Sequence, residues 1–151
     1  MFKRGWLAVA CLVLLQKTGF SQEEIVGIWY NDIKSTQIEI SNEGGDFQGK
    51  IIWLETTTNS DGSSPRIDEY NPDEDLAKRE LLGTTILHNL RWNPESKSWE
   101  KGLIYDPNNG KTYECSCRLR EEDELYLKGY VLGIPWLGRS STWTRAKVIE
   151  K

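Results

Sequence analysis

The sequence predicts an all-β fold, an eight-stranded antiparallel up-and-down barrel with one long loop that carries a short helix. Three observations predict it. Apolar and polar residues alternate with a period of two in one segment after another, as in half-buried strands. Glycine-rich and Asn-Gly turns separate these segments at short intervals. Only one connection, residues 55–83, is long, so consecutive segments are expected to pair, and ring closure then removes the exposed edges.

The alternative architecture is a two-sheet sandwich. Sandwiches usually need connections that cross from one sheet to the other, and only one loop of this chain is long enough for that. We therefore expect the barrel.

The first residues have the pattern of a secretory signal peptide. Lys3 and Arg4 precede the apolar run WLAVACLVLL, and small residues precede a cleavage after Ser21. The run is too short for an ordinary membrane span. We expect residues 1–21 to be a signal peptide, residues 22–151 to form one barrel domain, and the protein to be exported to the periplasm or the extracellular space.

Charge and cysteine content narrow the expected partners. The signal removes three basic residues, which lowers the net charge from −4 to −7. No basic cluster remains to neutralise phosphates, so we expect no nucleic-acid partner.

Cys115 and Cys117 point the same way on one strand, which is poor geometry for a disulfide, and we interpret them as buried thiols. A lipoprotein would need acylation of Cys11, and Leu7 lies one place too far upstream for the usual lipobox.

The expected strands follow one another through the chain. Ile38 and Ile40 alternate with polar residues in the second strand, and Asn109-Gly110 forms the tip of the hairpin between the fifth and sixth. The predicted strands are residues 24–31, 36–41, 47–55, 84–92, 98–106, 111–119, 122–132 and 138–147.

The long connection contains both the helix signal and an acidic segment. Asp73 at the start and Gly83 at the end of DEDLAKRELLG suit a short capped helix. Asp68, Asn71 and Asp73 offer oxygen ligands that a calcium ion accepts, but the segment lacks the glycine and the distal glutamate of the usual calcium loop. We favour a turn that leads into a helix N-cap, and we expect no metal and no cofactor.

An even number of alternating strands brings the start of the first strand beside the end of the last. Trp29 and Arg145 occupy these positions, and an arginine over an indole face contributes about 0.5–2 kcal/mol. We expect Gly27, Trp29, Trp143 and Arg145 to form a structural floor. The alternative is that Arg145 is an ordinary solvent-facing arginine.

The opposite end of the barrel is the expected entrance for a ligand. Four connections meet there: NDIKS, residues 55–83, DPNNG and LGIPWLG. The side chains that we place at this mouth as candidate ligand contacts are Trp53, His88, Tyr105, Tyr130, Trp136 and Arg139. The alternative is that Trp53 and Tyr105 fill the core and that His88 is a hydrogen-bonded core histidine. Arg139 shares the inward face of Trp143, and we expect it to pair with an acidic residue of the 55–83 loop or with a ligand carboxylate.

Two resemblances follow from these residues. Gly27-x-Trp29 together with Arg145 resembles the signature of the lipocalin-like, or calycin, barrels. The ordered segments GIWY, GKIIWL, DEYNPD, RELLGTTIL, WEKGLIYDPNNGKTYECSCRL and LYLKGYVLGIPWLGRSSTWTR resemble the exported bacterial family named domain of unknown function 2147. The chain departs from the usual pattern of that family at Ala77-Lys78-Arg79 and at GIPWLG. The resemblance implies a fold and export, and it implies no activity.

The function expected from the sequence is that of an exported, non-catalytic protein that binds a small apolar or amphipathic molecule or an envelope component. The alternative is an envelope protein-interaction module, in which GIPWLG is the contact patch and the core is filled. An unidentified hydrolase comes third, because the sequence has a single histidine and no Gly-x-Ser-x-Gly motif. The sequence makes no prediction of the oligomeric state.

Overall fold

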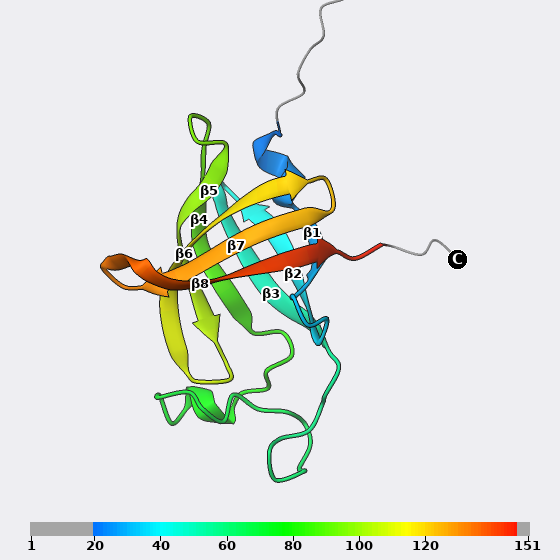
Figure 1. The fold of residues 1–151 in the computed structure, drawn as a ribbon. Helices are drawn as coiled ribbons and strands as arrows, with labels where there is room; N and C mark the ends of the chain where they lie inside the picture. Colours follow the sequence, from blue (N-terminus) through cyan, green and yellow to red (C-terminus); the bar gives the residue numbers. More distant parts are fainter. Residues whose placement is uncertain (1–19, 148–151) are drawn as a thin grey trace, which may run out of the picture.

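The structure is a computed structural model in which residues 20–147 are described. In these residues, eight antiparallel strands form a closed barrel in sequence order, so the predicted fold class is confirmed (Figure 1). The strands are β1 (Gly27–Tyr30), β2 (Thr36–Glu43), β3 (Asp46–Leu54), β4 (Thr85–Asn93), β5 (Ser98–Asp106), β6 (Lys111–Glu121), β7 (Glu124–Val131) and β8 (Ile134–Arg145).

The predicted signal peptide, residues 1–21, lies outside the described residues except for Phe20 and Ser21. None of the helices between residues 20 and 147 has the length and apolar character that crossing a membrane requires. These helices are single 3-10 turns, η1 (Gln22–Ile25) and η2 (Leu76–Lys78). Glu24 and Ile25 were predicted to begin the first strand, but they belong to η1, and its fully buried Ile25 covers the end of the barrel.

The filled half of the barrel lies next to η1 and the end of β8. Trp29, Trp99 and Phe47 are fully buried there. The ring centroids of Trp92 and Trp99 are 4.6 Å apart, and Phe47 meets Trp99 edge-on at 6.2 Å. The Trp99 indole N–H donates to the carbonyl of Gln22 at 3.2 Å, which ties η1 to the strands. Large aromatic side chains therefore close this half, because each buries much apolar area, and the indole N–H groups of Trp29 and Trp99 both donate to backbone carbonyls.

Three of the four predicted floor residues, Gly27, Trp29 and Arg145, lie together in the structure, whereas the fourth, Trp143, lines the cavity described below. Trp29 and Arg145 are paired across the β1–β8 seam, and the guanidinium carbon lies 4.1 Å from the centroid of the Trp29 ring. Arg145 donates to the carbonyls of Glu24 at 2.6 Å, Val26 at 3.0 Å and Glu122 at 3.1 Å. Gly27 has a φ of +137°, and a Cβ at this position would lie 2.8 Å from Nη1 of Arg145. Glycine is therefore required on two grounds, its backbone conformation and the space that the guanidinium occupies.

Two of the β-bulges change which candidate side chains face inward. In the β2–β3 ladder, Gln37 pairs with Trp53 and Ile38 with Ile51, so β3 contains an additional residue between the two pairs. In β4, Leu87 and Leu90 are both fully buried although they are three residues apart, and Asn89 between them has a φ of 57°. A bulge moves the residues beyond it to the other face of the sheet. Both changes affect candidate site residues, as described below.

Cys115 and Cys117 are unpaired thiols buried in the core, as the sequence predicted. Burial raises the pKa of Cys115 to about 12 from an ordinary value near 9. The pKa of Cys117 is also raised well above the ordinary value, first by burial and then by the neighbouring Cys115. The thiolate forms are disfavoured because the barrel interior cannot solvate them.

These thiols make stability depend on alkaline pH. Unfolded thiols lose protons as the pH rises past about 9, whereas the folded thiol at Cys115 keeps its proton until about pH 12. Their contribution is therefore complete below pH 9 and is lost between pH 9 and 12. We expect urea unfolding at pH 8, 9.5 and 10.5 to show a falling free energy of unfolding. The Cys115→Ala/Cys117→Ala double variant should show a shallower fall over the same range, and an equal slope in both proteins would contradict this prediction.

Candidate ligand-binding cavity

A cavity of about 650 Å³ occupies the half of the barrel opposite the Arg145 floor. Its mouth is formed by the β1–β2 and β5–β6 turns, the β3–β4 connection and the β7–β8 hairpin, the four segments that the sequence placed there. Cavities of this size hold one drug-sized molecule. The half of the barrel that the core side chains leave unfilled therefore opens to solvent at the predicted end.

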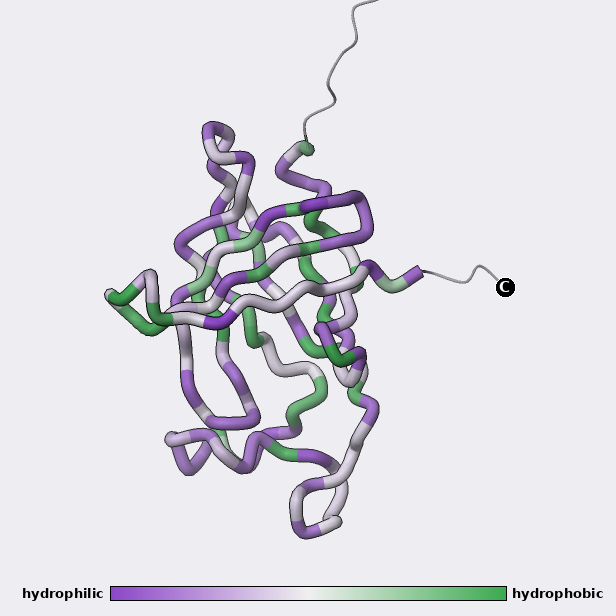
Figure 2. The backbone as a smooth tube through the Cα atoms, in the orientation of Figure 1, coloured by the Kyte–Doolittle hydropathy of each residue, from purple (hydrophilic) through white to green (hydrophobic). Residues whose placement is uncertain are grey.

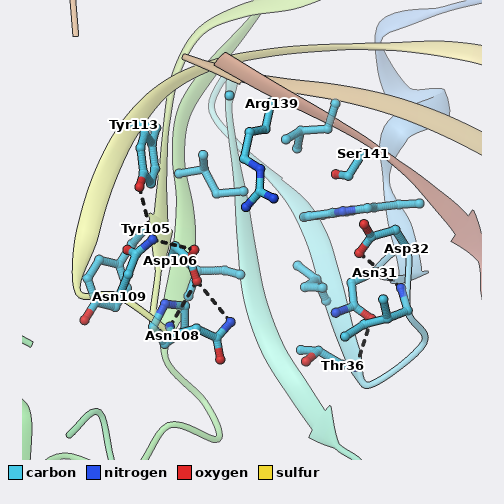
Figure 3. A pocket seen from close by; sticks show the side chains of 18 of the residues that line it. Asn31, Asp32, Thr36, Tyr105, Asp106, Asn108, Asn109, Tyr113, Arg139 and Ser141 are labelled. Atoms are coloured by element: carbon cyan, nitrogen blue, oxygen red, sulfur yellow. Dashed lines mark hydrogen bonds between the residues drawn. The ribbon is translucent and has the colours of Figure 1, made fainter. Parts of the chain in front are cut away.

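The cavity wall is largely apolar, and polar groups are added to it at the turns of the opening and along β8. Its apolar side chains are Ile38, Ile51, Leu54, Leu81, Ile86, Ile104, Leu127, Val131, Leu137 and Trp143. Polar and charged groups are contributed mainly by the turns and by β8, and they include Asn31, Asp32, Arg66, Tyr105, Asp106, Asn108, Asn109, Arg139 and Ser141. Figure 3 shows many of these side chains around the central space. A lining of this kind suits a molecule with an apolar body and one polar end.

Local hydrogen bonds order the turns at the mouth. The Asn31 side-chain oxygen accepts the backbone N–H groups of Ser35 at 2.8 Å and Thr36 at 3.2 Å. Across the opening, the Asp106 carboxylate accepts the backbone N–H of Asn108 and the side-chain amide of Asn109. These are the Asx-type contacts that Asn and Asp form in turns. The rim is held in shape by its own residues, so the opening is formed without a ligand.

A buried polar cluster fixes the β3–β4 connection beneath the rim. Asp68 is fully buried, and its Oδ1 accepts the Tyr105 hydroxyl at 2.6 Å. Oδ2 accepts Arg79 at 2.8 Å and the Asn71 amide at 2.8 Å. Burial, followed by the hydrogen bond to Asp68, raises the pKa of Tyr105 to about 12. The cluster joins the long connection to β5, and Tyr105 reaches the cavity with its hydroxyl proton already donated.

The three weak metal candidates have other partners in this arrangement. Both oxygens of Asp68 accept hydrogen bonds from side chains, including a guanidinium that already supplies a positive charge. Asp73 accepts the backbone N–H groups of Asp75 and Leu76 and so orders the turn that leads into η2, whose N-cap position is Asp75. Residues 20–147 contain no group of three or more His, Cys, Asp or Glu side chains that could hold a metal ion.

Arg139 is the candidate site residue with the most distinctive geometry. It lies on the inner face of β8, and its guanidinium points into the cavity (Figure 3). It is paired across the strands with Gly129, whose missing side chain leaves space beside it. Within the described chain, no hydrogen bond or ion pair of its side chain is present. The expected acidic partner in the 55–83 loop is therefore wrong, because Asp68 of that loop is bound to Arg79.

Tyr105 joins Arg139 as a predicted contact residue that lines the cavity, whereas four others lie elsewhere. The β3 bulge turns Trp53 away from the interior, where it packs edge-on against Tyr30 with 39% of its surface exposed. The β4 bulge likewise removes His88 from the core face, and its Nε2 lies 3.1 Å from the carbonyl of Thr85. For Trp53 and His88, both the predicted contact with the cavity and the alternative position in the core are therefore wrong, because a β-bulge turns each side chain to the other face of the sheet.

Tyr130 and Trp136 are also absent from the cavity wall. Gly129 lines the cavity, so the alternation of β7 turns the next residue, Tyr130, to the outside. Burial and the nearby Glu114 raise the pKa of Tyr130. Trp136 lies at the tip of the β7–β8 hairpin and is 83% exposed. Neither side chain contacts the enclosed space, so their predicted placement as cavity contacts is wrong.

Several cavity residues were missed by sequence reasoning although a signal for them was present. Ser141 lies between Arg139 and Trp143 at the same inward parity of β8. Asn31 and Asp106 lie in the segments NDIKS and DPNNG, which the strand order already placed at the mouth. Strand parity and turn membership are therefore sufficient to predict these positions, whereas residue type alone is not.

The β7–β8 hairpin adds an exposed apolar tip beside the opening. Leu132 is 69% exposed, Trp136 83% and Leu137 55%. Figure 2 shows this tip as a hydrophobic segment that projects from the barrel. Leu137 also lines the cavity, so the apolar surface continues from the wall onto the tip.

Comparison with known proteins gives a family and a fold. The model of a family described as "Uncharacterized protein conserved in bacteria (DUF2147)" matches residues 27–145. Among solved structures, protein HP1028 from Helicobacter pylori, described as belonging to the lipocalin family, is similar with a TM-score of 0.68 and 25% sequence identity. The match covers 81% of this chain and 82% of that chain. A comparison with curated proteins found no match. The resemblances identified from the sequence are confirmed.

Proposed function

The chain belongs to the bacterial family DUF2147. Because its barrel contains an open cavity, we propose that it is an exported, non-catalytic protein that binds a small amphipathic molecule. The observation that carries the proposal is the cavity of about 650 Å³, apolar along its wall and polar at its mouth. The lipocalin-like fold supports small-molecule binding. Export rests on the basic, apolar and small-residue pattern of residues 1–21.

Gly129 offers a way to close the cavity without disturbing the barrel. A Cβ added there would meet Ile104 at 3.7 Å and Tyr113 at 3.9 Å, which are ordinary contact distances. A larger side chain at this position is therefore directed into space that a ligand would occupy. Lys128, the preceding residue of β7, pairs with Ser140 and does not line the cavity. The same aromatic substitution at Lys128 provides a matched control.

We expect Gly129→Phe to weaken binding of the uncharged fluorescent probe N-phenyl-1-naphthylamine by about tenfold or more, because the ring takes the place of the ligand. Lys128→Phe should bind the probe like the wild type. Probe titration measures both affinities, and thermal unfolding checks that both variants are folded. Equal affinity in all three proteins, or no probe binding by the wild type, counts against a ligand-binding cavity. Native mass spectrometry of protein from its own source then identifies a retained molecule by mass.

The second candidate function is contact with an envelope partner through the β7–β8 tip. The exposure of Trp136 and Leu132 favours it, although the filled core that we expected in that case is absent, because the cavity is open. The probe experiment separates the two functions. If the protein acts only through the tip, Gly129→Phe should leave binding of the envelope partner unchanged.

A further inference from the structure

One positively charged side chain in the cavity, that of Arg139, has no partner among the described residues. Arg139 points into the space from β8, and within residues 20–147 its guanidinium forms neither an ion pair nor a hydrogen bond. The other arginine of the lining, Arg66, donates to Asn108 at 3.3 Å. Arg79, beneath the rim, is bound to Asp68. Arg139 is thus the arginine that remains available to a ligand in this part of the chain.

The acidic residues of the cavity lining do not pair with Arg139. Asp106 receives donors from Asn108 and Asn109, and Asp32 accepts the backbone N–H of Ile33. Asp32 belongs to the β1–β2 turn and Asp106 is the last residue of β5, so both lie at the rim, whereas Arg139 lies within β8. A guanidinium presents a planar set of donors that matches the two oxygens of a carboxylate. The inward-facing Ser141, two residues further along β8, adds a hydroxyl on the same face.

The apolar groups lie where the rest of such a ligand would extend. Trp143 follows Ser141 at the same parity and lines the wall together with Ile38 and Leu127. Successive inward residues of a strand are about 6.6 Å apart, so Arg139 lies about 13 Å of strand above Trp143. One end of the cavity therefore offers a positive charge and the other an indole with aliphatic neighbours.

Resting on the proposed binding function, we propose that the ligand is an amphipathic monoanion whose carboxylate is bound by Arg139 and whose apolar chain extends toward Trp143. The rim carboxylates Asp32 and Asp106 disfavour a ligand that carries further negative charge at the opening. The site thus selects for one anionic group joined to an apolar chain, and it selects against a cationic amphiphile.

The test compares decanoate, decanol, decylamine and acetate as competitors of N-phenyl-1-naphthylamine at pH 7.5, where decanoate is ionised. We expect decanoate to bind the wild type about tenfold or more tightly than decanol, and Arg139→Met to remove this preference while leaving decanol affinity within about twofold. Arg139→Lys should keep part of the preference, since it retains the charge. Arg118→Met, which removes an outward-facing arginine that lies over Tyr126, is the charge control and should bind like the wild type.

Each outcome supports or overturns the inference. Equal decanoate and decanol affinities in the wild type, or a decanoate preference that persists in Arg139→Met, overturn the role of Arg139. Tighter binding of decylamine overturns the anionic class, and competition by acetate at the concentrations that suffice for decanoate overturns the amphipathic class. If the probe binds but decanoate shows no preference, only this inference fails. If neither the probe nor any chain compound binds the wild type, the proposed function fails as well.

Discussion

Asp68→Ala is expected to lower the free energy of unfolding by about 3–5 kcal/mol, because it removes the buried acceptor of three side chains, among them the half-buried Arg79. Asp68 is fully buried and receives the Tyr105 hydroxyl on one oxygen and Arg79 and Asn71 on the other. Without the carboxylate, all three donors lose their acceptor, and water has little access to this buried position to take its place. Urea unfolding followed by tryptophan fluorescence measures the loss.

Two milder variants separate the parts of this cluster. Tyr105→Phe removes one donor and should cost about 1.5–3 kcal/mol, as for a hydrogen bond to a charged group. Asp73→Ala removes an exposed turn cap and should cost about 1 kcal/mol. The order of the three losses is the decisive result. An Asp68→Ala protein no less stable than Asp73→Ala would show that Asp68 does not anchor the long connection.

Sequence reasoning predicted the barrel because its evidence is spread over the whole chain. Period-two alternation and short turns occur repeatedly, so an error in one strand leaves the strand order intact. The pairing of Trp29 with Arg145 followed from the strand number and the alternating direction of the strands. The position of the mouth followed from the same count. These features depend on topology, which eight local patterns specify together.

The candidate site was predicted less well because a side chain's direction depends on each individual residue of a strand. One additional residue in β3 and the left-handed Asn89 in β4 reverse the faces of Trp53 and His88. No glycine or proline marks either bulge in the sequence. Arg139 was placed correctly because β8 alternates without interruption from it to Arg145.

The polar cluster around Asp68 shows a different limit. The sequence presents Asp68, Asn71 and Asp73 as one acidic segment with two interpretations, a cation site or a turn. The partners that decide between them, Arg79 and Tyr105, lie 11 and 37 residues further along the chain. Contacts at such separations depend on how the long connection folds back over the barrel, which local patterns do not specify.

Arg145→Met is expected to lower the free energy of unfolding by about 2–4 kcal/mol, because it removes a cation–π contact and the charged donors of several hydrogen bonds while keeping the length of the side chain. The guanidinium lies over Trp29 at 4.1 Å and donates to backbone carbonyls on both sides of the seam. The seam itself is short, with two paired positions between β1 and β8 against eight between β2 and β3. Side-chain contacts therefore carry much of the closure. Urea unfolding gives the loss.

Gly27→Ala tests the same closure from the backbone side. Its methyl group would lie 2.8 Å from Nη1 of Arg145, so the guanidinium must shift and the contacts at the floor weaken. Because both substitutions act on one set of contacts, the loss in the double variant should be smaller than the sum of the single losses. Arg118→Met, on the outer surface, should change stability by less than about 0.5 kcal/mol. Fully additive losses would mean that Gly27 is required for its backbone conformation alone, and that the position of Arg145 does not depend on it.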